Sequence, residues 1–441
     1  MDGLIYSAIA ENLSLNFNGS FHLFVSETFL SDFHEQPPLV FFLQALVIKL
    51  FNDVFFVDRF YSFLCLSFGL YLLFKIASKY TLLKENAWIV IMAFLCIPVV
   101  SWSYKNNMLE NTMCVFTLWS VYISFDYYIL KSKNLLIFTF QFSFMLWCSF
   151  MSKGFTGLFP FSIPFLFHLF YSKKTNHKWF LETVLLLLAF SLIVIVPFLL
   201  SPAFYNYVKT YFLTQVVASV NGNREVDGHF FIVKRVPQEL LILIIVTLIL
   251  NLKYGKNILV EICRKIKSNK PSQFFLVLAL FGSLPIMISP KQSGYYVLCS
   301  YPFFALFFAL INKEEILALT SNLKLKLLEG KFRILLVGLI ITSVSMSLFN
   351  WKRFYRDDTK ITMIDSIEHK MPHLKSIDIS WDFAQDYSLY AYFARRHNVS
   401  LYTPNYQNTK SIFLISKTLN EKEIIKANYV VNNEKIYLFS K

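Results

Sequence analysis

Residues 180–200 read FLETVLLLLAFSLIVIVPFLL, and no charged residue follows Glu182 in this run. About 20 predominantly apolar residues are enough for a helix to cross the hydrocarbon core of a bilayer. Comparable runs recur along the chain, which predicts an all-α polytopic membrane protein with about ten spans. The expected spans are 59–77, 87–103, 110–129, 134–151, 156–171, 180–200, 238–252, 273–289, 294–312 and 333–350.

The composition supports this class. The chain has 441 residues, of which 56% are hydrophobic and 16% charged, far too apolar for an ordinary soluble protein. The net charge of +14 could suggest a nucleic-acid partner, but the basic residues gather in short loops between apolar runs, as orientation signals do. We therefore expect no nucleic-acid binding. The six cysteines show neither a disulfide framework nor zinc-ligand spacing, and the start of the chain lacks the features of a cleavable signal peptide.

Loop charge predicts the orientation. Lysine and arginine concentrate in alternate loops, including 79–84, 131–133, 173–178, 253–270 and 324–333, which we expect to be cytoplasmic. The less basic set should face outward, and it comprises 1–58, 104–109, 152–155, 201–237 and 290–293. Ten spans from an external start also place residues 351–441 outside. The sequence thus predicts a multi-pass membrane protein whose less basic loops and residues 351–441 lie outside the cytoplasm.

Two domains are expected. Residues 1–350 form the transmembrane domain, in which 1–58 provide the first outward loop, a short amphipathic helix near Ile9 and a juxtamembrane or re-entrant helix over 39–51. Residues 351–441 predict a small extracytoplasmic α/β domain. Its expected strands are 376–381, 401–404, 411–416 and 429–438, with a helix over 387–396. Kinks are expected at Pro160, Pro164, Pro197, Pro285 and Pro302.

Three carboxylates stand at the start of apolar runs on the outward side: Asp2, Glu35 and Glu110. A single acid at this position is most simply a helix N-terminal cap. Three acids on one side of the membrane, beside polar loops, favour a shared functional site. Pro37 and Pro38 fit the first turn of the helix that follows Glu35, because proline has no backbone N–H to leave unpaired there.

The same loops supply cations, namely Lys153, Arg224, Lys234, Arg235 and Lys291. They could be solvated loop charges or lysines that reach toward headgroups. Alternatively they bind phosphate, for which lysine and arginine are the natural partners. Carboxylates and cations together at membrane level suggest a lipid-phosphate substrate.

His229 is the histidine of interest in these loops. A lone loop histidine is most often polar surface. Paired with Glu35 it could instead hold a divalent ion, zinc or otherwise magnesium or manganese, since imidazole and carboxylate both serve as ligands.

Several motifs resemble one family. They are Asp2-Gly-Leu-Ile-Tyr6, Glu35-Gln-Pro-Pro-Leu39, Arg59-Phe-Tyr-Ser62, Asn107-Met-Leu-Glu110, Ser152-Lys-Gly154 and Lys291-Gln-Ser-Gly-Tyr-Tyr296. Together they resemble membrane glycosyltransferases of the GT-C fold, in particular the aminoarabinose transferase and protein O-mannosyltransferase-like group. The resemblance covers roughly residues 1–310, and residues 351–441 resemble the aminoarabinose branch only loosely.

The resemblance implies transfer of a sugar from a polyprenyl-phosphate carrier to a lipid, glycan or protein acceptor on the outer membrane face. It implies Asp2 as the main catalytic carboxylate and Glu110 as a second one. It links Glu35 and His229 to a metal, and it places Tyr6, Lys153 and either Lys234 or Arg235 near the carrier phosphate; Lys291 is a further candidate for phosphate binding.

The sequence departs from this family at two points. Gln36 stands where the aminoarabinose branch has a lysine, and the family's first span, which precedes the catalytic aspartate, is missing before Asp2. A wrongly assigned start, a fragment of a longer chain and an inactive truncated relic are therefore all open alternatives. A transporter or flippase of lipid-linked sugars is another, but it should carry polar residues near span centres and paired repeats. The charged residues here stand at outward span ends, which favours an enzyme.

Overall fold

The computed structural model describes residues 2–17, 21–51, 56–81, 83–131, 134–171, 178–217, 230–289, 292–327, 341–342, 345, 357–371, 374–403, 413–416, 429–431 and 436–440. They form two compact units. The membrane unit consists of His34–Leu43 and Phe56–Lys324, and the terminal unit of Met1–Phe33, Gln44–Phe55 and Leu325–Lys441.

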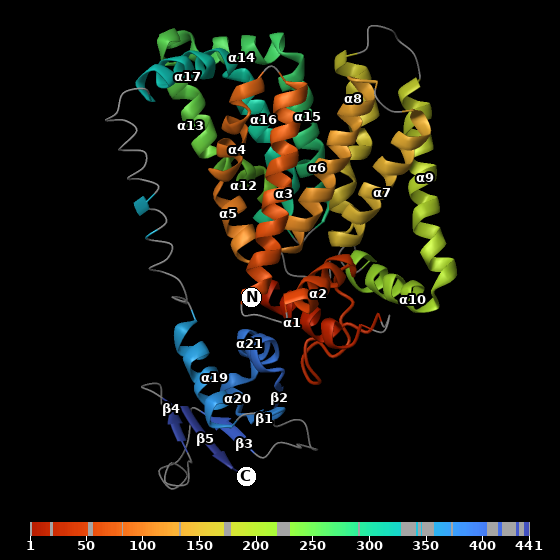
Figure 1. Cartoon of the computed structure of the whole chain (residues 1–441), viewed down its shortest axis with the longest axis vertical. Helices are drawn as coiled ribbons and strands as arrows, with labels where there is room; N and C mark the ends of the chain where they lie inside the picture. The colour runs from red at the N-terminus through yellow and green to blue at the C-terminus, as the bar shows by residue number, and fades with distance from the viewer. Residues whose placement is uncertain are drawn as a thin grey trace. The chain divides into compact units, whose positions relative to one another are not determined.

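The membrane unit is a bundle of helices (Figure 1). Its helices are α3 (Val57–Tyr80), α4 (Trp88–Leu95), α5 (Pro98–Lys105), α6 (Leu109–Tyr128), α7 (Leu135–Lys153), α8 (Ile163–Tyr171), α9 (Lys178–Leu200), α10 (Pro202–Tyr211), α12 (Phe231–Glu239), α13 (Leu241–Leu250), α14 (Ile258–Ser268), α15 (Lys270–Ser283), α16 (Tyr301–Ile311) and the start of α17 (Lys313–Leu327). Short helical segments join them: η1 (Lys84–Asn86), η2 (Phe155–Ser162), η3 (Phe212–Val217), η4 (Leu252–Asn257), η5 (Leu284–Ile288) and η6 (Gly294–Ser300).

The described helices confirm a polytopic membrane protein. Five helical segments are long and apolar enough to cross a bilayer, and up to seven if each bent pair counts as one span. The five segments are Val57–Tyr80, Leu135–Lys153, Lys178–Leu200, Lys270–Ile288 and Gly294–Ile311. The predicted spans 110–129 and 156–171 are also helical, whereas most of 333–350 lies outside the described residues.

Burial separates helices that face lipid from those in the bundle centre. Only 6% of the apolar window of α9 is buried, whereas 78% of the window over Gly294–Ile311 is buried. In the centre, Phe125 of α6 stacks on Phe275 of α15 with ring centroids 5.5 Å apart and meets Phe167 of α8 edge to face. α6 therefore packs against α8 and α15 near its C-terminal end. Its first turn, which contains Glu110, lies at the other end of the helix.

A sharp bend falls at Pro98, a proline that the sequence motifs do not single out. α4 and α5 meet at 78° where Ile97 is extended and Pro98 begins the next helix. A proline at this position ends the preceding helix because it has no N–H to donate and disfavours a helical residue before it. The kink predicted at Pro197 does not interrupt α9, which runs without a break from Lys178 to Leu200.

Three buried carboxylates mark the end of the bundle opposite the α6 N-terminus. Asp126 pairs with Lys79 at 2.8 Å, and Glu182 accepts a hydrogen bond from the Tyr128 hydroxyl at 2.8 Å. Glu315 of α17 pairs with Lys265 of α14 at 2.7 Å. Each of these acids therefore has a polar or cationic partner near a helix end.

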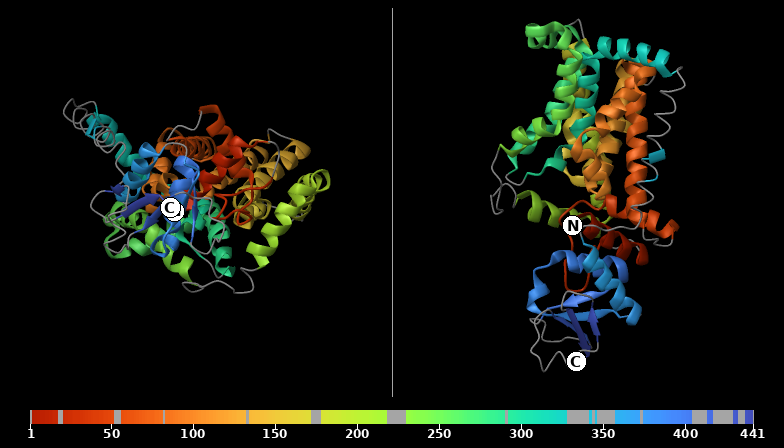
Figure 2. Two further views of the ribbon diagram at one scale, coloured as in Figure 1. Left: turned by 90° about the horizontal axis from the view of Figure 1, so that it is seen from below. Right: turned by 90° about the vertical axis from the view of Figure 1, so that its left-hand side faces the viewer.

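The terminal unit contains α1 (Asp2–Leu15), most of α2 (Leu39–Phe51) and a five-stranded sheet with helices. Its later elements are α19 (Asp358–Lys370), β1 (Ser376–Ile379), α20 (Trp381–Ala384), α21 (Tyr387–His397), β2 (Ser400–Tyr402), β3 (Phe413–Ser416), β4 (Tyr429–Val431) and β5 (Ile436–Ser440). The strand order is β2-β1-β3-β5-β4, in which β1 pairs parallel with β2 and β3, and β5 pairs antiparallel with β3 and β4. Side chains of α19 and α21 pack with those of β1 and β2 in one apolar core. The right-hand view of Figure 2 shows the blue helices of this region beside the strands of the sheet.

The small α/β domain is thus confirmed, with three differences from prediction. The run 429–438 is two antiparallel strands, β4 and β5, rather than one. Helix α19 was not predicted. Helix α1 was expected to be amphipathic around Ile9, yet it is buried on most sides, because small and polar residues such as Ser7, Ala8 and Asn12 are buried as well.

Candidate functional site

A buried glutamate at the N-terminus of α6 forms an ion pair with a lysine that is almost buried. Glu110 stands in the first turn of α6 with no solvent exposure, and its Oε1 is 3.3 Å from the Nζ of Lys153. The Lys153 side chain is 9% exposed. A carboxylate in a first turn is favoured by the partial positive charge of the helix N-terminus. Both charges are thus present in a desolvated place, where electrostatic interactions are stronger than in water.

A polar network fixes the start of α6. Asn111 accepts a hydrogen bond from the Ser103 hydroxyl at 2.8 Å and donates one to the Ser62 hydroxyl at 3.2 Å. The Ser62 hydroxyl in turn donates to the side chain of Asn107 at 3.1 Å. Asn107 adopts a positive φ of 50°, a conformation that asparagine tolerates better than most residues. The Asn-Met-Leu-Glu-Asn segment therefore ties α6 to α3 and α5 and sets the direction of the Glu110 side chain.

Lys153 ends α7 among aromatic residues. Its ammonium lies 5.4 Å from the centre of the Tyr296 ring, a cation–π distance. Gly154 follows with φ +94°, and a Cβ there would overlap the hydroxyl of Tyr211. Burial raises the pKa of Tyr211 to about 12, while the positive charge of Lys153 acts in the opposite direction. Tyr211 and Tyr296 are therefore neighbours of Lys153 that the sequence analysis did not name as site residues.

A second ion pair stands on α12. Arg235 Nη2 is 2.5 Å from Glu239 Oε1, and Glu239 Oε2 accepts a hydrogen bond from the Val99 N–H at 2.8 Å. Glu239 is buried, whereas the Arg235 side chain is 43% exposed. The Arg235 Nε lies only 3.0 Å from where a Cβ of Gly294 would stand. Segment η6 thus contacts both pairs, through Tyr296 on one side and Gly294 on the other.

This geometry separates the two cations that the sequence left as alternatives. Lys234 is exposed and no described contact ties it to η6, whereas Arg235 is held by Glu239. Glu239 itself was missed, although its position four residues after Arg235 is the spacing of a helical ion pair.

The Glu35 segment lies against α10. The Tyr207 hydroxyl donates to the backbone carbonyl of Gln36 at 2.8 Å, and the His34 ring lies 4.7 Å from the Tyr207 ring. Pro37 and Pro38 are buried, while Glu35 is exposed. Glu35 is therefore free of steric cover and accessible to a ligand from solution.

The other predicted residues lie elsewhere. Asp2 and Tyr6 stand on α1 in the terminal unit, where Asp2 is partly exposed and Tyr6 buried. His229 and Lys291 lie outside the described residues. Within the described part of the chain, no group of three or more histidine, cysteine, aspartate or glutamate side chains could hold a metal ion. The Glu35–His229 metal site stays a prediction.

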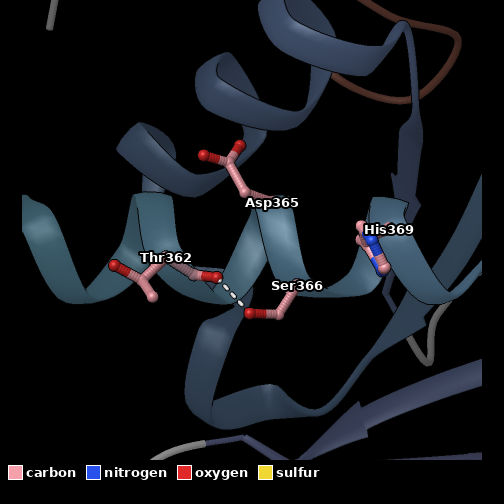
Figure 3. Close-up of a pocket in the computed structure, with 4 residues that line it drawn as sticks. All are labelled: Thr362, Asp365, Ser366 and His369. Atoms are coloured by element: carbon pink, nitrogen blue, oxygen red, sulfur yellow. Dashed lines mark hydrogen bonds between the residues drawn. The ribbon is translucent and has the colours of Figure 1, made fainter. Parts of the chain in front are cut away.

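A separate hollow of about 380 Å³ opens on the terminal unit (Figure 3). Thr362, Asp365, Ser366 and His369 line it, and the Ser366 hydroxyl donates to the Thr362 carbonyl at 2.6 Å. All four residues belong to one helix, α19. Binding sites usually converge side chains from several elements around a concave pocket, so the polar end of the membrane unit is the stronger candidate.

Comparisons with known proteins agree with this fold. Residues 35–200 match the family model described as dolichyl-phosphate-mannose-protein mannosyltransferase. The crystal structure of ArnT from Cupriavidus metallidurans bound to undecaprenyl phosphate is similar with a TM-score of 0.65 and 11% identity, over 99% of this chain and 93% of that chain. The apo structure of the same protein gives a TM-score of 0.62, 11% identity and coverages of 99% and 92%. No curated protein matches the chain in sequence.

The chain is therefore a multi-pass membrane protein with the GT-C glycosyltransferase fold, as the sequence motifs predicted. The stretch that carries the family match, 35–200, includes Glu35, Glu110 and Lys153.

Proposed function

We propose that the protein transfers a sugar from a polyprenyl-phosphate carrier to a lipid, glycan or protein acceptor on the extracytoplasmic face of the membrane. The buried Glu110–Lys153 pair is the observation that carries this proposal. It holds a carboxylate and an ammonium together at one end of the helical bundle, where a carrier phosphate could stand with its prenyl chain in lipid. The similarity to an undecaprenyl-phosphate complex of ArnT supports the same substrate class.

In the proposed reaction, an acceptor hydroxyl attacks the anomeric carbon of the sugar. A new carbon–oxygen bond forms as the bond to the carrier phosphate breaks, and its electron pair leaves with the phosphate. The hydroxyl proton passes to a carboxylate, which we assign to Asp2 with Glu110 as the second acid. Attack from the side opposite the leaving group inverts the anomeric configuration.

Cations would stabilise the phosphate as its negative charge develops. Lys153 is the candidate with the best geometric support, because it is already held in a buried, polar place. Arg235 stands beside η6, and Lys234, Lys291 and Tyr6 remain candidates from the sequence. The anionic phosphodiester of the sugar donor would compete with Glu110 for the ammonium of Lys153.

The proposal includes a divalent metal only as an ion bound by Glu35 and His229. Such an ion would add positive charge next to the phosphate. Glu35 is exposed and available for this role.

Orientation rests on loop charge. The site end of the bundle belongs to the loops that are poor in lysine and arginine, and the opposite end carries Lys79, Lys131, Lys178, Lys253 and Lys265. The positive-inside rule therefore favours an extracytoplasmic site. Cysteine labelling from each side of sealed vesicles, with single cysteines at Lys105 and Lys256, would test this arrangement.

The decisive experiment is a transfer assay with polyprenyl-phosphate sugars and the purified protein in lipid. Asp2→Asn and Glu110→Gln should each remove transfer. Glu182→Gln is the matched control, because Glu182 is an equally buried carboxylate at the opposite end of the bundle, and it should retain transfer. Full activity of both site variants would overturn the catalytic assignment. Movement of the carrier across vesicles without a covalent product would contradict an enzyme.

The metal assignment needs its own measurement. Metal content of the purified protein should fall in Glu35→Gln and in His229→Ala compared with the parent chain. Unchanged metal content in both variants, or none in the parent, would remove the metal from the proposal.

A further inference from the structure

Within the terminal unit, helix α1 is joined to the α/β domain by an ion pair that is almost fully buried. Arg395 of α21 donates to Oε2 of Glu11 at 3.0 Å, and the two side chains are only 7% and 12% exposed. The partners are 384 residues apart in the chain. A buried pair of this kind is costly to break, because removal of one partner leaves a desolvated charge.

The loop that follows α1 is docked on the same domain. The ring of Phe29 packs against the domain's apolar core and stacks on Tyr387 with centroids 5.7 Å apart. Next to it, the Thr28 hydroxyl donates to the Leu401 carbonyl at 2.6 Å and the Tyr402 hydroxyl to Glu27 at 2.5 Å. The loop is thus held by apolar packing of Phe29 and by side-chain hydrogen bonds with residues of β2.

The loop also holds α1 from its other side. The Asn12 side chain donates to the carbonyls of Phe24 at 3.0 Å and Val25 at 2.9 Å. Glu11 and Asn12 are adjacent, so one turn of α1 is fixed both to α21 and to the docked loop. Few rotations or shifts of α1 are compatible with both sets of contacts.

We infer that the C-terminal α/β domain positions helix α1, and that Arg395 is a positioning residue for Asp2. This inference rests on the proposed function, in which Asp2 is the main catalytic carboxylate. Asp2 precedes Glu11 by nine residues on one helix, about 14 Å at the helical rise of 1.5 Å per residue. Arg395 therefore acts through α1 and not on the reacting atoms. The C-terminal domain becomes part of the catalytic apparatus rather than a separate appendage.

The kinetic test first removes each charge of the Glu11–Arg395 pair and then exchanges the two charges. Arg395→Gln and Glu11→Gln should each lower kcat by roughly 10- to 100-fold, the size of effect expected from a small displacement of a catalytic group. The KM for the carrier should change less than kcat, since Lys153 is untouched and only Tyr6 among the phosphate-binding candidates lies on α1. The exchanged double variant Glu11→Arg with Arg395→Glu should recover much of the lost kcat. Arg396→Gln, which alters the neighbouring pair with Asp365, is the matched control and should keep kcat.

A structural measurement separates this inference from the proposed function. Hydrogen exchange of residues 2–15 should accelerate in Arg395→Gln and return toward the parent rate in the exchanged double variant. If the parent chain shows no transfer, the proposed function fails, while the exchange data still decide whether Arg395 holds α1. Where Arg395→Gln does not accumulate, Phe29→Leu provides a milder loosening of the same docking.

Two outcomes would overturn the inference. One is unchanged exchange in α1 together with unchanged kcat in Arg395→Gln. The other is a loss of kcat that the exchanged double variant does not recover, accompanied by an equal rise in the carrier KM, because that pattern would indicate general damage rather than misplacement of α1.

Discussion

At the scale of single residues, the Glu110–Lys153 pair has two opposing properties. Burial makes each charge costly alone, and their proximity makes them tolerable together. Under the proposed function, a phosphate that enters this place would meet an ammonium that already lies beside the Tyr296 ring. Lys153 would then be the partner of Glu110 in the free protein and a cation for the substrate in the complex.

A double-mutant cycle should reveal this coupling. Lys153→Met removes the ammonium beside the buried Glu110 carboxylate. We expect the free energy of unfolding to fall by about 3–5 kcal/mol. Adding Glu110→Gln removes the charge and should recover a large part of that loss. Thermal melting in detergent measures both. Additive effects of the two substitutions would contradict a direct interaction.

Gly154 allows a second test at this scale. Gly154→Ala should cost about 1–3 kcal/mol, because φ +94° is strained for alanine and its Cβ would overlap the Tyr211 hydroxyl. Gly255→Ala is the matched control, with φ +53° and open space around the added Cβ, and should cost less. Tyr211→Phe should rescue part of the Gly154→Ala loss and none of the Gly255→Ala loss. Equal melting points for the two alanine variants would show that the Tyr211 contact has no effect.

Single residues also show the limits of sequence reading. The sequence predicts that Glu110 and Lys153 lie on the same side, because the spans 110–129 and 134–151 are joined by a short loop. It does not indicate that the two side chains come within 3.3 Å of each other. The sequence gives no sign of a role for Tyr211, which is one of several tyrosines in the outward loop 201–237, and only its packing against Gly154 makes it a neighbour of Lys153.

At the scale of elements, α14 and α17 are tied by Glu315. Burial alone would raise the pKa of Glu315, but hydrogen bonds from Lys265, from the backbone and from Lys253 lower it below its usual value. A lowered folded-state pKa means that the stabilisation is present above the unfolded pKa near 4.5 and is lost as pH falls through the folded value.

We therefore expect the melting temperature to fall on acidification below about pH 5, and to fall less in Glu315→Gln. The variant should be less stable than the parent chain at pH 7, and the two curves should approach each other at low pH. Glu314→Gln, at the exposed neighbouring position on α17, should follow the parent curve. Parallel curves for the parent chain and Glu315→Gln would exclude a contribution from this carboxylate.

Elements differ in how well the sequence predicts them. The helices with uniform apolar composition, such as α9, fall within a few residues of the predicted spans. The span 87–103 breaks into α4 and α5 because Pro98 stops the first helix and the Glu239 carboxylate accepts the N–H of Val99 in the second. That contact joins positions 140 residues apart, which hydropathy does not report.

At the scale of the whole molecule, most of the surface of α9 is expected to face lipid, since only 6% of its apolar window is buried. Leu192, at the middle of the helix, is 63% exposed, and Leu200, at its end, is 78% exposed. Leu192→Lys should insert poorly, because a lysine at the centre of a span costs about 2.5–3.5 kcal/mol. Leu200→Lys is the matched control, since a lysine at a span end can reach the interface. The membrane-integrated fraction after expression measures both, and equal integration would show that Leu192 does not face the hydrocarbon core.

The domain plan was predictable only in part. The change of composition after residue 350 indicated an α/β domain, and the sheet confirms its class. Nothing in the local pattern indicated that α1 and the loop over 21–33 belong to the same compact unit as β1 and β2. The local sequence around Glu11 and Phe29 does not indicate their roles, because their contact partners, Arg395 and Tyr387, lie more than 350 residues further along the chain.

The Glu11–Arg395 pair has a consequence for biosynthesis. Ribosomes add about 5–20 residues per second, so Arg395 follows Glu11 out of the tunnel by roughly 20–80 s. During that interval the helices between them enter the membrane before the Glu11–Arg395 pair can form. The terminal unit can therefore close only after Arg395 has been made, and a chain released earlier would lack this ion pair.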